Sequence, residues 1–214
     1  MDSLYTKTHI RESLDPRPST PEEDMQWLVG ASADVVSQVR ASLPSRRVPA
    51  AVLVPLVARA TGLTVLLTQR AATLKDHAGQ ISFPGGRIEP KDEDAWHAAL
   101  RETQEEIGLR PDFVEFAGYL PDHLVITGFR VTPVVGFVDP AYELRIAKAE
   151  VHDAFEVPLD FILDAANHKP RRRTVGGLTI EVHDIPYGDR NIWGATAGML
   201  MTLRRKLQAR GEKS

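Results

Sequence analysis

The stretch "GQISFPGGRIEPKDEDAWHAALRETQEEIGL", residues 79–109, joins a glycine pair to a segment of helical periodicity that carries three glutamates. The periodicity predicts a helix from about residue 94 to residue 107, ended by Gly108 as the residue after the last turn. Its apolar stripe has the spacing of a helix face packed on a core and consists of Trp96, Ala99, Leu100, Thr103 and Ile107.

The glutamates of this helix, Glu102, Glu105 and Glu106, lie within about 100° of one another on an adjoining face. Like charges at this spacing repel, so a positively charged partner is expected there. A solvated acidic face is the alternative for any glutamate-rich helix. One turn earlier the same face carries only Ala95 and Ala98, which predicts room for a ligand beside the carboxylates.

The preceding "FPGGR" favours a ligand site, because Pro84, Gly85 and Gly86 predict a bend whose backbone can approach a ligand closely. Carboxylates together with a backbone carbonyl form an oxygen-only ligand set, which suits Mg²⁺ or Mn²⁺. Mg²⁺ usually completes its shell with water and substrate phosphates, so the pattern indicates attack on a phosphate chain. Arg101 stands four residues before Glu105, close enough to pair with it.

Composition limits the possible functions. The chain has 214 residues, of which 43% are hydrophobic, and a formal charge of −3, which does not favour a nucleic-acid partner. With no cysteine, disulfides, thiolate metal sites and a cysteine nucleophile are excluded. No apolar run approaches the roughly 18 residues of a membrane span, and the N-terminus lacks the features of a signal or transit peptide. We therefore expect a cytoplasmic protein with no membrane partner.

The chain is predicted to consist of an N-terminal arm with an amphipathic helix, residues 1–47, and one mixed α/β layered domain, residues 48–214. The polar first 25 or so residues are expected to form a poorly ordered lead-in, and apolar residues at 35, 36, 39 and 43 predict the helix. The arm and this helix could pack on the domain or on a partner. Two hairpins, two further strands, a short helix near residue 160 and a C-terminal helix from "NIWGATAGMLMTLRRKLQAR" are predicted downstream.

The central stretch resembles the Nudix box, a glycine, a glutamate and then R-E-x-x-E-E-x-G. Six residues separate the first two positions here, against five in the commonest form of the box. The matching residues are Gly86, Glu93, Arg101, Glu102, Glu105, Glu106 and Gly108.

A second resemblance covers about residues 48–207. "LLTQRAATLKDHAGQISFPGG", residues 66–86, is similar to the stretch before the box in the coenzyme A pyrophosphatase branch of Nudix hydrolases, as are "GYLPDHLVITGFRVTPVVGFV", "EVPLDFIL" and "NIWGATAGML". The resemblance implies the Nudix α/β/α sandwich around a mixed β-sheet. It also implies metal-dependent hydrolysis of the CoA diphosphate to 3′-phosphoadenosine 5′-phosphate and 4′-phosphopantetheine.

The resemblance further implies the metal ligands. Glu102 and Glu106 would be the main ligands of Mg²⁺ or Mn²⁺, and Glu105 and the Gly86 carbonyl would complete the site. The general base is Glu105 or, from a later loop, Glu150, for which an ordinary glutamate at the start of a helix is the alternative. Arg101 belongs with the catalytic groups as the side chain that orients Glu105.

Four residues near the glycine loop are candidates for binding the substrate phosphates: Arg70, Lys75, His77 and Arg87. Each is equally well explained as a surface charge, and His77 alternatively as a structural residue that holds the loop.

Three functions compete. The first is hydrolysis of CoA or acyl-CoA, and the second is Nudix hydrolysis of another nucleoside diphosphate such as ADP-ribose or NADH. The third is a non-catalytic Nudix-fold binding module, which three intact acids on the helix disfavour. A small-molecule substrate is expected, and a homodimer is possible by resemblance.

Overall fold

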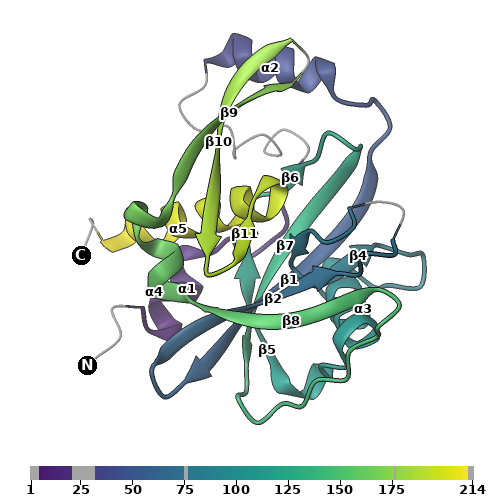
Figure 1. The fold of residues 1–214 in the computed structure, drawn as a ribbon, viewed down its shortest axis with the longest axis vertical. Helices are drawn as coiled ribbons and strands as arrows, with labels where there is room; N and C mark the ends of the chain where they lie inside the picture. The colour runs from purple at the N-terminus through teal and green to yellow at the C-terminus, as the bar shows by residue number, and fades with distance from the viewer. Residues whose placement is uncertain (1–4, 21–31, 75–76, 176, 212–214) are drawn as a thin grey trace.

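A mixed β-sheet has helices on both faces in the computed structural model, which describes residues 5–20, 32–74, 77–175 and 177–211 (Figure 1). Within these residues the sheet has eight strands, with β3-β2-β1-β7-β5 as its main path. β4 also pairs with β1, β6 with β7 and β8 with β2, and only β1 and β7 run parallel. The strands are β1 (Val48–Arg59), β2 (Gly62–Arg70), β3 (Ile81–Ser82), β4 (Gly85–Arg87), β5 (Val114–Tyr119), β6 (His123–Leu124), β7 (Phe129–Val138) and β8 (Val151–Pro158).

The central strand β1 is apolar along most of its length because both of its faces are covered. Ala51 and Leu53 face one buried cluster, and Val54 and Leu56 face the other. Pro55 is tolerated in this strand because it lies between the residues of β1 paired with β4 and those paired with β2.

One helix covers one face of the sheet, and three helices cover the other. The first face packs on α3 (Ala95–Ile107). The opposite face packs on α1 (Lys7–Ser13), α4 (Leu159–Leu163) and α5 (Gly194–Gly211). The predicted α/β/α sandwich with a mixed sheet is confirmed.

A second sheet has the order β11-β10-β9 and extends from the main body toward α2 (Figure 1). Its strands are β9 (Lys169–Val175), β10 (Leu178–Tyr187) and β11 (Arg190–Ile192), and α2 spans Ala33–Ser42. Val39 and Leu43 pack with Leu124 of β6 and Val182 of β10. The predicted amphipathic helix and the hairpin near residue 176 are thus confirmed, and the helix packs on the chain's own domain.

The N-terminal lead-in differs from expectation. Residues 7–13 form α1, whose Ile10 is fully buried in the main core, and Asp15 makes a β-bridge to Tyr119. The helix was not predicted because only Ile10 and Leu14 supply an apolar i, i+4 pair in an otherwise polar segment. The prediction of a poorly ordered lead-in is therefore wrong for these residues, and the boundary at residue 47 stays a prediction.

Within the described residues, no helix combines the length and apolar character needed to cross a membrane.

Candidate active site

The carboxylate helix α3 begins and ends as its sequence predicts. Asp94 accepts a hydrogen bond from His97 N at 2.9 Å, which satisfies one of the free N–H groups of the first turn. Gly108 has a φ of 71° and ends the helix in the left-handed region. A Cβ at Gly108 would lie 2.7 Å from Arg145 Cβ, so close contact with a later loop also requires glycine here.

The small residues before the glutamates do not leave an open space. Ala95 is 8% exposed and Ala98 is fully buried, and both belong to the cluster between α3 and the sheet. The expected ligand space beside these alanines is therefore wrong. Their small size instead lets the helix approach the sheet closely.

The glycine pair forms the short strand β4, which pairs with Ala51 and Val52 of β1. A Cβ at Gly86 would lie 2.5 Å from the carboxyl group of Glu102. A Cβ at Gly85, where φ is 148°, would lie 2.4 Å from the Ala51 carbonyl oxygen. Both glycines are needed so that β4 can lie between the central strand and the carboxylate of the helix.

Glu106 is the most buried of the three glutamates, with 5% of its surface exposed. Its Oε2 accepts a hydrogen bond from Gly85 N at 3.2 Å. Burial raises the pKa of Glu106 to about 7, and the negative charges of Glu102 and Glu150 add to the rise, whereas Gly85 N–H and the charge of Arg70 oppose it. A divalent cation at this position would offset the unfavourable burial of the charge.

Arg101 holds two of the carboxylates in place. Its Nη1 donates to Glu102 Oε1 at 2.9 Å and to Glu105 Oε2 at 3.2 Å. The Glu102 side chain is 17% exposed and that of Glu105 is 56% exposed. Burial raises the pKa of Glu102 in spite of Arg101, with the charges of Glu105 and Glu150 acting in the same direction.

Asp92, which was not among the predicted site residues, is the main partner of Arg101. Asp92 accepts from Arg101 Nε at 2.8 Å and from Nη2 at 2.9 Å, a two-pronged pairing that fixes the guanidinium plane. This hydrogen bonding lowers the pKa of Asp92 to about 2. Five residues separate Asp92 from Gly86, the commonest spacing of the box, so the spacing could have identified it. Glu93, by contrast, is exposed and lies 3.6 Å from the His97 ring.

Glu150 reaches the site through the connection between β7 and β8. Ala147 N donates to the backbone carbonyl of Glu106 at 2.8 Å, and Glu150 N donates to the Ala147 carbonyl at 2.9 Å. Glu150 directly precedes β8, so it does not begin a helix. Its negative charge adds to the rise in the pKa of both Glu102 and Glu106.

The four candidate phosphate ligands have different environments. The charge of Arg70 acts on Glu106, and Arg70 Nε is buried without a hydrogen-bond partner among the described residues. Arg87 is the next residue after Gly86 on β4 and pairs with Ala50 of β1. Its guanidinium lies 5.7 Å from the Phe129 ring centre. Because neighbouring residues of a strand point to opposite faces, Arg87 faces away from Glu102.

The other two candidates lie on the loop before β3. His77 has a φ of 58°, its carbonyl accepts from Gln80 N at 3.1 Å, and its Nδ1 lies 2.8 Å from Gln80 Oε1. These contacts fit the alternative of a histidine that holds the loop. Lys75 lies outside the described residues.

The donor set fits a hard divalent cation by its chemistry. Glu102 and Glu106 are carboxylates whose pKa is raised by burial, so a cation would stabilise their charged forms. In the described part of the chain, no group of three or more such side chains is close enough to hold one metal ion as it stands. Glu102 is instead bonded to Arg101 and Glu106 to Gly85 N, so a cation would compete with these contacts.

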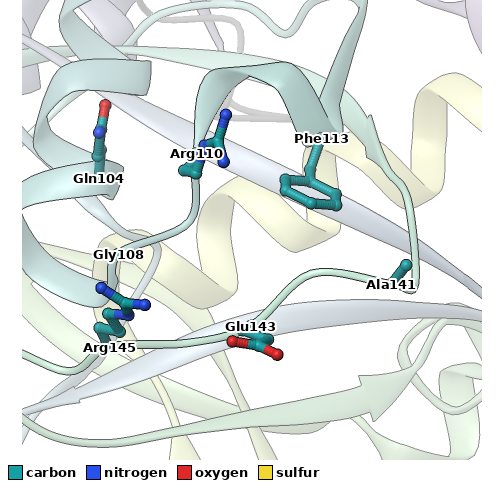
Figure 2. Close-up of a pocket in the computed structure, with 7 residues that line it drawn as sticks. All are labelled: Gln104, Gly108, Arg110, Phe113, Ala141, Glu143 and Arg145. Atoms are coloured by element: carbon teal, nitrogen blue, oxygen red, sulfur yellow. The ribbon is translucent and has the colours of Figure 1, made fainter.

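An open cavity of about 630 Å³ lies at the C-terminal end of α3, apart from the predicted site residues. Figure 2 shows its lining, which combines two arginines and Phe113 with one acidic side chain. The carboxylate face identifies the candidate active site better than this cavity, because the chemistry of phosphate transfer needs the acids. The lining residues are Gln104, Gly108, Arg110, Phe113, Ala141, Glu143 and Arg145.

Comparison with known proteins identifies the class to which this sandwich and carboxylate helix belong. The NUDIX domain profile matches residues 47–175, and the chain belongs to the Nudix family. It is 41% identical over 174 residues to a Nudix hydrolase called NudL from Citrobacter koseri, covering 81% of this chain and 89% of the relative. NudL of Escherichia coli K12 is 42% identical over 155 residues, covering 72% and 80% of the two chains.

The fold is shared with the MutT protein of Methanosarcina mazei Go1, at a TM-score of 0.50 and 17% identity over 79% of this chain and 99% of that one. The family and the relatives named hydrolases show that the protein is a Nudix pyrophosphatase enzyme. This disfavours the non-catalytic binding module. Nudix hydrolases generally use divalent metal ions.

Proposed function

We propose that this enzyme hydrolyses the diphosphate of coenzyme A or acyl-CoA, giving 3′-phosphoadenosine 5′-phosphate and 4′-phosphopantetheine or its acyl derivative. The proposal rests on residues 66–86, which resemble the coenzyme A pyrophosphatase branch. The observation that carries it is Arg70 of this segment, whose buried Nε has no hydrogen-bond partner among the described residues and whose charge acts on Glu106.

Arg70 is the residue best suited to hold a substrate phosphate. A buried guanidinium N–H without an acceptor is costly, and a phosphate oxygen would satisfy it. The charge of Arg70 opposes the rise that burial causes in the pKa of Glu106, so the guanidinium and the carboxylate face act on each other electrostatically. Lys75 and His77 remain further candidates, and the opposite-face position makes Arg87 a weaker one.

Glu102 and Glu106 would hold Mg²⁺ or Mn²⁺, with Glu105 and the Gly86 carbonyl as further ligands, and the ion would neutralise the diphosphate and acidify a water molecule. Arg101 acts as a positioning residue, since it fixes the carboxylates of Glu102 and Glu105 and is itself fixed by Asp92. Gly86 leaves the space that the Glu102 carboxylate occupies.

Glu150 is our candidate for the general base. It would accept a proton from the attacking water as a new P–O bond forms and the bridging P–O bond of the diphosphate breaks. The freed bridging oxygen stays on the departing phosphate. Glu105 is the alternative base, but its hydrogen bond to Arg101 favours a positioning or ligand role.

A substrate panel tests the proposal. With Mg²⁺ or Mn²⁺ present, CoA, acyl-CoA, ADP-ribose and NADH would be compared by kcat/KM, and products would be identified by mass spectrometry in H₂¹⁸O. We expect CoA or acyl-CoA to be preferred, with ¹⁸O in a phosphate product and the 3′-phosphate retained. Efficient ADP-ribose or NADH cleavage without CoA cleavage would establish the alternative Nudix activity instead.

A further inference from the structure

The connection between β7 and β8, residues 139–150, is held at its start by a cluster of polar side chains. Tyr142 OH donates to Glu156 Oε1 at 2.7 Å. Arg59 donates to Glu156 from Nε at 3.0 Å and from Nη2 at 2.5 Å, and its Nη1 donates to the Pro140 carbonyl at 3.1 Å. The Thr64 hydroxyl adds another bond to Glu156. We call Arg59, Thr64, Tyr142 and Glu156 the loop clamp.

The middle of the same connection is bonded to the end of the carboxylate helix. Arg145 N donates to the Ile107 carbonyl at 2.7 Å, and Ala147 N donates to the Glu106 carbonyl at 2.8 Å. These bonds satisfy carbonyls that a helix end would otherwise leave to water. Figure 2 shows Arg145 beside Gly108, where a Cβ would meet the arginine.

The end of the connection positions Glu150. Glu150 N and Val151 N both donate to the Ala147 carbonyl at 2.9 Å, and the Glu150 carbonyl accepts from Ala71 N at 2.8 Å. The backbone of Glu150 is therefore bonded to Ala147, which itself bonds to α3. It is also bonded to Ala71, the residue directly after the end of β2 at Arg70. One continuous set of contacts leads from Glu156 through residues 140–147 to Glu150.

From this arrangement we infer that the loop clamp positions Glu150 for catalysis, an inference that rests on the proposed role of Glu150 as base. Residues 139–150 contain neither helix nor strand, so their order depends on these attachments and on the packing of Leu144 and Ile146 against the core beside α3. A general base must be held within hydrogen-bonding reach of its proton, and small displacements lower the rate. The clamp acts through the loop and does not touch the carboxylate face.

The first test is Tyr142→Phe, which keeps the ring and removes only the hydroxyl. We expect kcat to fall about tenfold with KM nearly unchanged, because positioning affects the chemical step. Amide hydrogen exchange at Arg145 and Ala147 should become at least several-fold faster, while β1 stays protected. Tyr187→Phe is the matched control, since Tyr187 lies in β10 of the second sheet and its ring packs on Phe161 of α4. This variant should leave both measurements unchanged.

A double mutant separates positioning from general stability. If Tyr142 acts through Glu150, then Tyr142→Phe should have little further effect on kcat in the Glu150→Gln background. Multiplicative losses in the double mutant would overturn the inference, as would wild-type kcat and wild-type exchange in Tyr142→Phe. If Tyr142→Phe fails to fold, Arg59→Lys tests the same cluster, because lysine keeps the charge but loses the two-pronged pairing.

Failure of the proposed function has a different outcome. If the wild-type enzyme cleaves ADP-ribose but not CoA, the substrate assignment is wrong. The role of the loop clamp is then decided by the same kcat comparison with ADP-ribose as substrate. A wild-type rate in Glu150→Gln would reject the base and the clamp's catalytic role together. Loss of rate in Glu150→Gln without any loss in Tyr142→Phe and Arg59→Lys rejects the clamp alone.

Discussion

Two arginine-centred networks of the domain differ in their charge balance. Arg59 is paired with one carboxylate, Glu156, whose pKa the arginine lowers to about 2 with help from the hydroxyls of Thr64 and Tyr142. Arg101 is bonded to three carboxylates, Asp92, Glu102 and Glu105. In the second network Arg101 lowers the pKa of Asp92, whereas burial raises that of Glu102.

This difference in charge balance distinguishes a network that stabilises the fold from one that is suited to binding a cation. A matched pair satisfies its own charges and stabilises the fold. A surplus of partly buried carboxylates is unfavourable without a further cation, so the fold retains it at a cost in stability. The Arg101 network therefore combines one structural pair, Arg101 with Asp92, and a set of acids available for a metal ion.

The largest effect is expected for Glu106→Gln. Removal of a charged ligand should lower kcat about a hundredfold or more, because the bound cation would lose one of its main ligands. Steady-state kinetics across a range of Mg²⁺ or Mn²⁺ concentrations measures the loss. Unchanged metal-dependent turnover would remove Glu106 from the site.

The metal-free Glu106→Gln protein provides the control for folding. Glutamine can still accept the Gly85 N–H and carries no buried charge, so the free energy of unfolding at pH 7 should not decrease. A clear loss of stability in urea denaturation would instead assign Glu106 a structural role like that of Glu156.

The second prediction concerns Glu156→Gln and stability. The pKa of Glu156 is lowered below its ordinary value, so its charge stabilises the fold fully above about pH 4.5, and this contribution is lost as the pH falls toward 2. The variant should be less stable by about 2 kcal/mol at pH 7, allowing for the partial exposure of Arg59. The difference from wild type should shrink below pH 4.5 in denaturant titrations. A difference independent of pH would contradict the assigned role of the charge.

The third prediction tests how Arg101 acts. Arg101→Lys keeps a positive charge but loses the fork that binds Asp92, so we expect kcat to fall about tenfold while the protein stays folded. Asp92→Asn should give a similar loss, since both changes release the same guanidinium. Wild-type kinetics in Arg101→Ala would show that the orientation of Glu102 and Glu105 does not matter.

Much of the fold was predictable because its elements have clear local signals. Helix α3 has an apolar stripe, an Asp cap and a terminal glycine, and the first hairpin has apolar strands joined by Thr61 and Gly62. Strand β8 and the helix α1 were missed. Their stability comes from packing on the rest of the chain, through partners distant in the sequence such as β2 for β8 and α5 for α1.

The site shows the same limit. The carboxylates of α3 could be predicted as metal ligands from the Nudix box, because three glutamates and two glycines fall within one local segment. The burial of Ala95 and Ala98 depends on how closely the sheet approaches, which helical spacing alone does not specify. The loop clamp joins Arg59 to Glu156 across 97 residues, a pairing that no local pattern indicates.

The smallest effect is expected for Arg87, and it tests the two faces of the sheet. Arg70→Ala should lower kcat/KM for CoA about tenfold or more, because the charge of Arg70 acts on Glu106 and its buried Nε has no acceptor among the described residues. Arg87→Ala should change this kcat/KM at most about twofold, because the Arg87 side chain lies over Phe129 on the opposite face.

Dephospho-CoA sharpens the comparison, since it lacks the 3′-phosphate. If Arg87 binds that group, Arg87→Ala should lower kcat/KM for CoA and leave that for dephospho-CoA unchanged. Equal and small changes for both substrates would exclude Arg87 from 3′-phosphate recognition and leave the carboxylate face with Arg70 as the phosphate site.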